Sequence, residues 1–101
     1  MNEIKTTIAN QINIAELNMA RFLIMQEGDN KIIVKKGVKY VTIEYDNSRD
    51  TYIVIEGSYS RKTFETKEEK TEDVYADMLR PIIEEHFKFE YVMDRIMAAR
   101  C

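Results

Sequence analysis

The chain has 101 residues, of which 45% are apolar and 33% are charged. This length fits one domain, residues 1–101, and the apolar content suffices for a modest core, so two domains and wholesale disorder are excluded. The net charge of −3 argues against a generally basic surface that neutralises phosphates. The single cysteine, Cys101, can form neither an intramolecular disulfide nor a zinc site by itself, which suits a reducing cytoplasm.

The N-terminal segment predicts a helix over residues 3–26. Apolar side chains recur there at spacings of three and four, which keeps them on one helical face: Ile4, Ile8, Ile12, Ala15, Met19 and Phe22. Gly28 is a strong stop signal, because glycine readily takes the left-handed conformation that ends helices. Charged residues are interspersed in this segment, so we expect no membrane span.

The middle of the chain predicts strands, because apolar and polar residues alternate there and β-branched residues are frequent. The expected strands cover residues 31–36, 38–46 and 51–57, with a weaker run to about residue 66. The polar segment 46–50 is typical of a hairpin turn. Gly37 and Gly57 each indicate a turn or a bulge. We therefore expect an α+β fold with a three- to four-stranded antiparallel sheet.

The C-terminal part predicts a long helix. Thr66 and Glu69 have the spacing of a capping box, Thr71 offers a second start, and apolar residues recur at spacings of three and four from Tyr75 to Ile96. Pro81 lies within this segment, and proline inside a helix removes a hydrogen bond and clashes with the preceding turn. The spacing of the apolar residues continues unchanged across Pro81, which favours one helix kinked at this residue. The alternative is two helices, of which the second begins at Pro81.

Little in the chain suggests catalysis. His86 is the only histidine, and Glu85, Glu90 and Asp94 on the same predicted helix would supply too few ligands for a metal. We expect it to be partly buried and hydrogen-bonded. No serine lies in the small-residue elbow that exposes a nucleophile, and three glycines in the chain form no phosphate-binding loop. We expect a non-enzymatic protein without cofactor or metal.

Four lysines around the first predicted strand are a candidate nucleic-acid surface, since lysines contact phosphates and the neighbouring Tyr40 could stack on a base: Lys31, Lys35, Lys36 and Lys39. Lysines on an edge strand also prevent aggregation, which is the alternative. The order helix, strands, helix occurs in double-stranded RNA-binding domains, but acidic residues 68–73 stand where those domains carry a lysine cluster. We therefore expect nucleic acid not to be the partner.

Two further groups predict contacts with another protein. The first is acidic and forms either a docking surface for a basic partner or a solvated helix start: Glu68, Glu69, Glu72, Asp73 and Asp77. The second is apolar and lies in phase near the C-terminus: Phe89, Met93 and Ile96. Because an exposed apolar face usually marks an interface, it predicts a homodimer or, as the alternative, a monomer bound to another protein.

Together these features predict a small acidic, cytoplasmic, protein-binding domain. Size, charge and class alone, without any motif, suggest an analogy with phage or mobile-element inhibitors and adaptors that dock on host nucleic-acid-processing machinery, such as anti-CRISPR proteins. The same three properties suggest a dimeric protein like the secretion chaperones. The other alternative is nucleic-acid binding through the lysines of residues 31–39.

Overall fold

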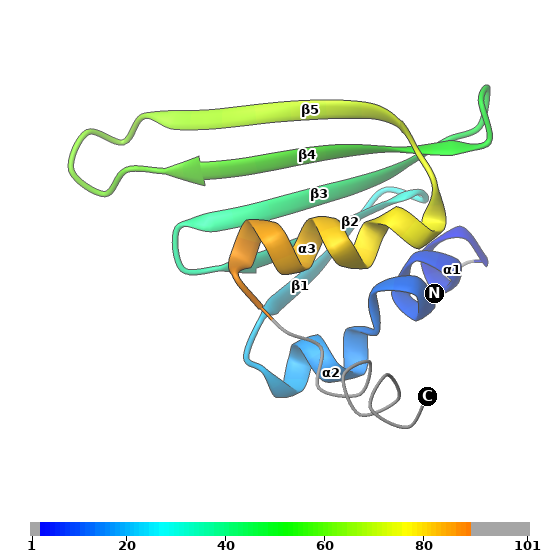
Figure 1. Ribbon diagram of the computed structural model, residues 1–101, viewed down its shortest axis with the longest axis horizontal. Coiled ribbons are helices and arrows are strands. Elements are labelled where there is room, and N and C mark those ends of the chain that lie inside the picture. The colour runs from blue at the N-terminus through cyan, green and yellow to red at the C-terminus, as the bar shows by residue number, and fades with distance from the viewer. Residues whose placement is uncertain (1–2, 90–101) are drawn as a thin grey trace.

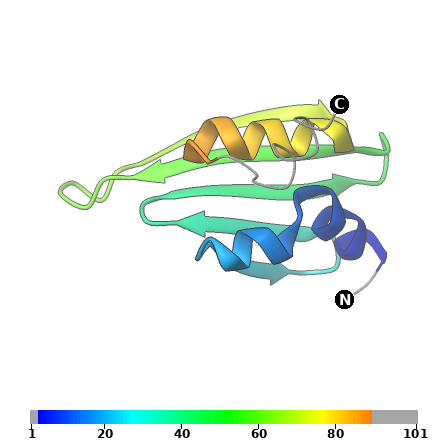
Figure 2. The same ribbon diagram turned by 60° about the horizontal axis from the view of Figure 1, so that its bottom comes forward.

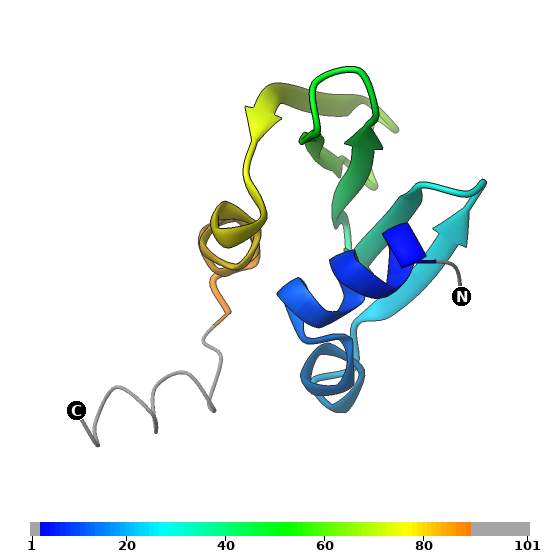
Figure 3. The same ribbon diagram turned by 90° about the vertical axis from the view of Figure 1, so that its right-hand side faces the viewer.

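The computed structural model describes residues 3–89, in which all helices lie on one side of an antiparallel sheet (Figures 1 and 3). The elements in chain order are α1 (Glu3–Ile12), α2 (Ile14–Met19), β1 (Leu23–Glu27), β2 (Lys31–Lys36), β3 (Lys39–Asp46), β4 (Thr51–Tyr59), β5 (Thr66–Val74), the short 3-10 helix η1 (Ala76–Met78) and α3 (Leu79–Phe87). The α+β class is confirmed, but the sheet has five strands in the order β1-β2-β3-β4-β5, more than the three or four expected.

The core lies between the helices and the sheet. Alternate residues of β2, β3 and β4 point toward the helices and are buried there, as the predicted alternation requires. α1 and α2 lie across β1 and β2, while α3 lies beside β3 and β4 (Figure 2). The fully buried aliphatic side chains are Ile8, Ile12, Leu17, Ile32, Val34, Val41, Ile43, Val54, Val74, Leu79 and Ile83. Burial of each stabilises the fold by about 1.5–3 kcal/mol before entropic costs.

The predicted helix over residues 3–26 is interrupted at Asn13 and ends at Met19, so the prediction is wrong for residues 20–26. The chain breaks at Asn13, which has a φ of 53° and whose side-chain oxygen accepts a hydrogen bond of 3.3 Å from the Glu16 amide. Asparagine tolerates the left-handed conformation and caps helices, so it ends α1 and begins α2. Arg21, with a φ of 68°, then redirects the chain into β1, which pairs with β2.

The predicted helix start at residues 66–73 is also wrong, because these residues form β5. This strand pairs with β4 along its length and is exposed at every residue except Val74. An edge strand exposed on both faces needs no apolar alternation, so its sequence lacks the usual strand pattern. The hairpin of β4 and β5 extends beyond the end of α3 (Figure 1).

The helix does not run through Pro81 from an earlier start. α3 begins at Leu79 after η1, so Pro81 lies in the first helical turn. N–H groups in that turn have no intrahelical partner, so the missing N–H of proline costs no hydrogen bond there. The helix ends at Lys88, which has a φ of 56°. The predicted continuation through Met93 and Ile96 lies outside the described residues. Within residues 3–89, no helix has the length and apolar character needed to span a membrane.

Candidate functional site

The sheet face turned away from the helices has no covering element among residues 3–89 (Figure 3). Cross-strand pairing places four of its side chains directly opposite one another on β1 to β4: Met25, Ile33, Thr42 and Ile55. We call this set, which is apolar except for Thr42, the apolar row. Its members on β2, β3 and β4 are half-buried by their neighbours, and Met25 on the edge strand is 38% exposed. The uncovered face therefore has an apolar centre that reaches the free side of β1.

A second set of residues crosses the same face beside the apolar row and joins β3 to β5. Gly57 on β4 lies under the ring of Tyr40, and a Cβ atom at Gly57 would lie 2.2 Å from the Tyr40 Cζ. The Tyr40 hydroxyl donates a hydrogen bond to the Glu68 carboxylate on β5. Burial, the hydrogen bond and the charge of Glu68 raise the pKa of Tyr40 to about 12. Gly57 is thus neither a turn nor a bulge but the site over which this tyrosine crosses β4.

The four candidate lysines do not form one surface. Lys31 lies on the uncovered face between Glu27 and Glu44, with N–O distances of 4.0 and 3.8 Å. Lys35 lies on the same face, its Nζ 5.4 Å from the centre of the Tyr59 ring. Both are therefore engaged within the chain.

The other two lysines turn toward the helices. Lys36 Nζ donates to the Ala20 carbonyl at 3.1 Å, and Lys39 Nζ donates to the His86 carbonyl at 3.1 Å. These carbonyls lie at the C-terminal ends of α2 and α3, where cations are favourable. The prediction of nucleic-acid binding through this group stays a prediction, with two of its lysines placed away from the other two.

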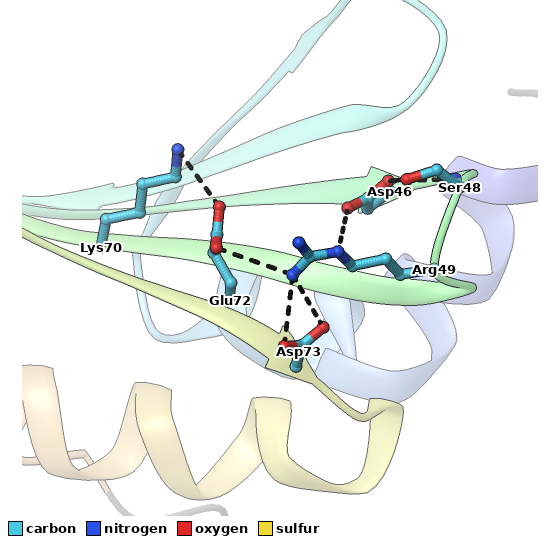
Figure 4. A network of polar contacts seen from close by, with 6 residues as sticks. All are labelled: Asp46, Ser48, Arg49, Lys70, Glu72 and Asp73. Carbon is cyan, nitrogen blue, oxygen red and sulfur yellow. Dashed lines mark hydrogen bonds and ion pairs between the residues drawn. The ribbon is translucent and has the colours of Figure 1, made fainter.

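The five candidate acids are likewise separated. Glu68 lies on the uncovered face, Glu69 on the helix side and Asp77 in η1. Glu72 and Asp73 lie near Arg49 of the β3–β4 turn, at N–O distances of 3.7 and 3.3 Å. Figure 4 shows this network, which also contains Asp46, Ser48 and Lys70. Two of the predicted docking carboxylates are therefore paired with a cation of the same chain.

A hollow of about 420 Å³ lies between α3 and the sheet and has charged walls. Glu56 and Glu69 lie directly opposite each other there on β4 and β5, an unfavourable pair of like charges. His86 lies beside them: its Nε2 donates to the Gly57 carbonyl at 3.0 Å, and its Nδ1 is 3.5 Å from the Glu56 carboxylate. The expectation of a partly buried, hydrogen-bonded histidine is confirmed. Residues 3–89 contain no group of three side chains placed to hold a metal ion.

Of the predicted apolar interface, only Phe89 is described, and it lies against the core. Its ring centre is 5.1 Å from that of Phe22, which also meets Phe87 at 4.9 Å. Because Phe22 directly precedes β1, this aromatic cluster joins the end of α3 to the start of the edge strand. Met93 and Ile96 lie outside the described residues.

Sequence reasoning missed the exposed apolar side chains around β1. Met19 at the end of α2 is 85% exposed, and Leu23 at the start of β1 is 55% exposed. Both lie within the segment for which the sequence predicts a helix, residues 3–26. The signal that could have located Leu23 is the short apolar run 22–25 before Gly28, which suits a strand as well as a helix.

The tip of the β4–β5 hairpin was also missed. Phe64 is 82% exposed there and has a φ of 59°, a conformation that bulky residues rarely adopt. Its amide donates to the Ser60 carbonyl at 2.8 Å, and the Ser60 amide donates to the Glu65 carbonyl at 2.9 Å. The loop is therefore closed by backbone hydrogen bonds and presents Phe64 to solvent.

No protein-family model, curated protein or solved structure matches this chain.

Proposed function

We propose that this chain is a non-enzymatic protein-binding domain whose binding surface is the uncovered sheet face together with the free side of β1. The observation that carries the proposal is the exposure of Leu23 and Met25 where the apolar row reaches the edge of the sheet. Exposed apolar patches with a polar border are typical of protein interfaces.

The free backbone groups of β1 support the same function. Within residues 3–89, β1 pairs only with β2, so its outer side offers unpaired N–H and C=O groups. Proteins commonly bind an extended segment by adding it to such an edge, with neighbouring side chains providing specificity. Methionines beside the edge favour binding, because their flexible side chains adapt to a partner surface.

The arrangement of charges favours a protein over a nucleic acid. Lys31 is balanced by Glu27 and Glu44, and Glu68 borders the uncovered face, so the face presents no continuous positive charge for phosphates. The narrower proposal of an inhibitor or adaptor that docks on host nucleic-acid-processing machinery rests on small size, acidic charge and fold class.

Affinity capture with paired variants tests the proposal. The full chain is immobilised as wild type, as Leu23→Glu with Met25→Glu, and as Phe64→Glu, and captured proteins from a lysate of the source organism are compared by mass spectrometry. We expect a saturable protein partner with the wild type and with Phe64→Glu, and its loss with the β1 variant. Capture that is equal for all three folded proteins contradicts the proposed surface.

A separate titration tests the alternative partner class. Labelled duplex DNA and RNA are titrated with the protein at physiological salt and followed by fluorescence polarisation. We expect no saturable binding in the micromolar range. Tight binding that is lost on changing Lys31 and Lys35 to Glu would replace the protein-binding proposal by nucleic-acid binding on the same face.

A further inference from the structure

We infer that β1 pairs with β1 of a second copy of this chain, antiparallel and about a twofold axis, so that two sheets join into one. The inference rests on the proposed function, because it names the partner of the same surface. In such a pairing, the N–H and C=O groups of β1 that have no partner within residues 3–89 form hydrogen bonds with those of the second copy's β1. A twofold axis normal to the sheet also keeps the helices of both copies on the same side.

The side chains of β1 suit pairing with themselves. A twofold axis normal to the sheet must place one residue of β1 opposite the same residue of the second copy. The axis that best matches the side chains of β1 passes through Ile24. Each Leu23 then lies opposite the second copy's Met25, on the uncovered face. Side chains directly opposite on antiparallel strands contact each other, so four exposed apolar side chains gather around the axis. The apolar row of each copy then ends opposite Leu23 of the other copy.

The charges at the two ends of β1 are complementary in this register. Arg21 precedes the strand and Glu27 ends it, and both are exposed. With the axis at Ile24, the turn that carries each Arg21 lies at the end of the strand pairing, beside the second copy's Glu27, where the long side chain can form an ion pair. The twofold axis gives two such pairs. Between them, residues 22–26 carry no charge. No like charges oppose each other within this segment.

The other edge of the sheet lacks this property. On β5 the four consecutive residues 67–70 are all charged, so an axis through any of them places a charge opposite its own copy. An axis at Thr71 avoids this but places Glu69 opposite the second copy's Asp73. Like charges directly opposite destabilise a strand pair, and charged edges prevent association between sheets. Self-pairing is therefore favoured at β1 and opposed at β5.

Sedimentation velocity of the full chain tests the pairing. We expect a dimer for the wild type at about 100 μM, a concentration at which even a modest interface of micromolar affinity is filled. Leu23→Glu should be monomeric, because it places two carboxylates beside the axis. This variant retains its fold because position 23 lies opposite Lys35 within the chain. Phe64→Glu, the same type of change at the hairpin tip, should remain dimeric.

Charge exchange tests the register. Arg21→Glu and Glu27→Arg should each weaken the dimer about tenfold, because each change places like charges opposite at two symmetric positions. Combining the two changes restores opposite charges and should restore the dimer. In a Cys101→Ser background, Ile24→Cys should form a disulfide between copies on oxidation, since the two residues face each other at the axis. Gln26→Cys, two residues along the strand, should not.

Three results would overturn the inference: a monomeric wild type at about 100 μM, a dimer that Leu23→Glu leaves intact, or a double charge exchange that fails to restore dimerisation. These outcomes are distinct from failure of the proposed function. A monomer that still captures another protein through Leu23 and Met25 would retain the protein-binding function and exclude the second copy as its partner.

Discussion

The two edges of the sheet differ in length, charge and support. β1 has five residues, of which only Glu27 is charged, whereas six of the nine residues of β5 are charged. β1 follows directly from Phe22, which is buried among aromatic rings, while β5 is held by polar contacts such as the hydrogen bond from the half-buried Tyr40 to the exposed Glu68. One edge thus carries exposed apolar side chains, and the other carries charges, which oppose association between sheets.

The stability of the two edges should therefore depend on different forces. Burial of apolar surface anchors β1, and it contributes several kcal/mol at a single large side chain. Apart from the buried Val74 at its end, β5 is anchored by its backbone pairing with β4 and by exposed ion pairs and hydrogen bonds. Each of these polar contacts contributes about 1 kcal/mol or less. Substitutions at the two edges can test this difference.

The largest expected effect compares two phenylalanines. Phe22→Ala should lower the free energy of unfolding by about 3–5 kcal/mol, because it leaves a cavity beside Phe87 and Phe89. Phe64→Ala, at the tip of the β4–β5 hairpin, should change it by less than about 0.5 kcal/mol, because the side chain is exposed. Urea denaturation followed by circular dichroism measures both. Equal losses would mean that the hairpin tip is as well supported as the start of β1.

The next effect concerns the tyrosine that crosses β4. Gly57→Val should lower the free energy of unfolding by about 1–3 kcal/mol, because the new side chain displaces the Tyr40 ring and its hydrogen bond to Glu68. The same substitution in a Tyr40→Ala background should cost less, since the clash is absent. Chemical denaturation of the two single variants and the double variant gives this coupling. A cost that is the same in both backgrounds would contradict the proposed displacement.

A smaller effect, of opposite sign, is expected at Glu69. Glu69→Lys should raise the free energy of unfolding by about 0.5 kcal/mol, because it replaces the repulsion from Glu56 by attraction. Glu72→Lys provides the matched control on the same strand. It should lower stability by less than about 1 kcal/mol, because Glu72 lies 3.7 Å from Arg49. Thermal melts at low and high salt compare the two variants. Destabilisation by Glu69→Lys would show that another group already balances the negative charge of Glu56.

The smallest effect is a pH dependence at β5. The pKa of Tyr40 is raised to about 12, so its stabilising contribution is complete below the unfolded value of about 10. That contribution decreases as the pH rises from there through about 12, because the phenolate repels Glu68. Difference titration of tyrosinate absorbance between wild type and Tyr40→Phe measures the pKa. Glu68→Ala should lower it, although burial, the largest cause, remains. An unchanged pKa in Glu68→Ala would contradict the hydrogen bond.

The central strands could be predicted from sequence, and the two edge strands could not. β2, β3 and β4 alternate in burial, so their residues carry the period of two. β5 has no apolar alternation because both of its faces are exposed, and its Glu and Lys residues favour helices in isolation. At β1 the helical period of Ile12, Ala15, Met19 and Phe22 continues past the break at Asn13. Pairing with a neighbouring strand overrides local preference at both edges.

The errors in the predicted binding surfaces follow from these errors in secondary structure. The apolar binding surface was placed on the C-terminal helix, and its first member, Phe89, instead lies against Phe22. Leu23 and Met25 lie within the segment predicted as a helix over residues 3–26, so the sequence does not reveal their exposure on an edge strand. The four lysines were correctly placed in and beside the first predicted strand, but sequence does not reveal that Lys36 and Lys39 bend toward helix ends.

The strand order has a consequence for folding. Each strand pairs with the strand that follows it in the chain, so every pairing can form by closing a short loop. Low contact order of this kind favours rapid folding. Packing on the helix side of the sheet needs segments that are far apart in the chain. Arg80 Nε, for example, donates a hydrogen bond of 2.6 Å to the Gln11 carbonyl, 69 residues away. During synthesis the hairpins can therefore form as they emerge, whereas the hydrophobic layer beneath them closes only after α3 has been made.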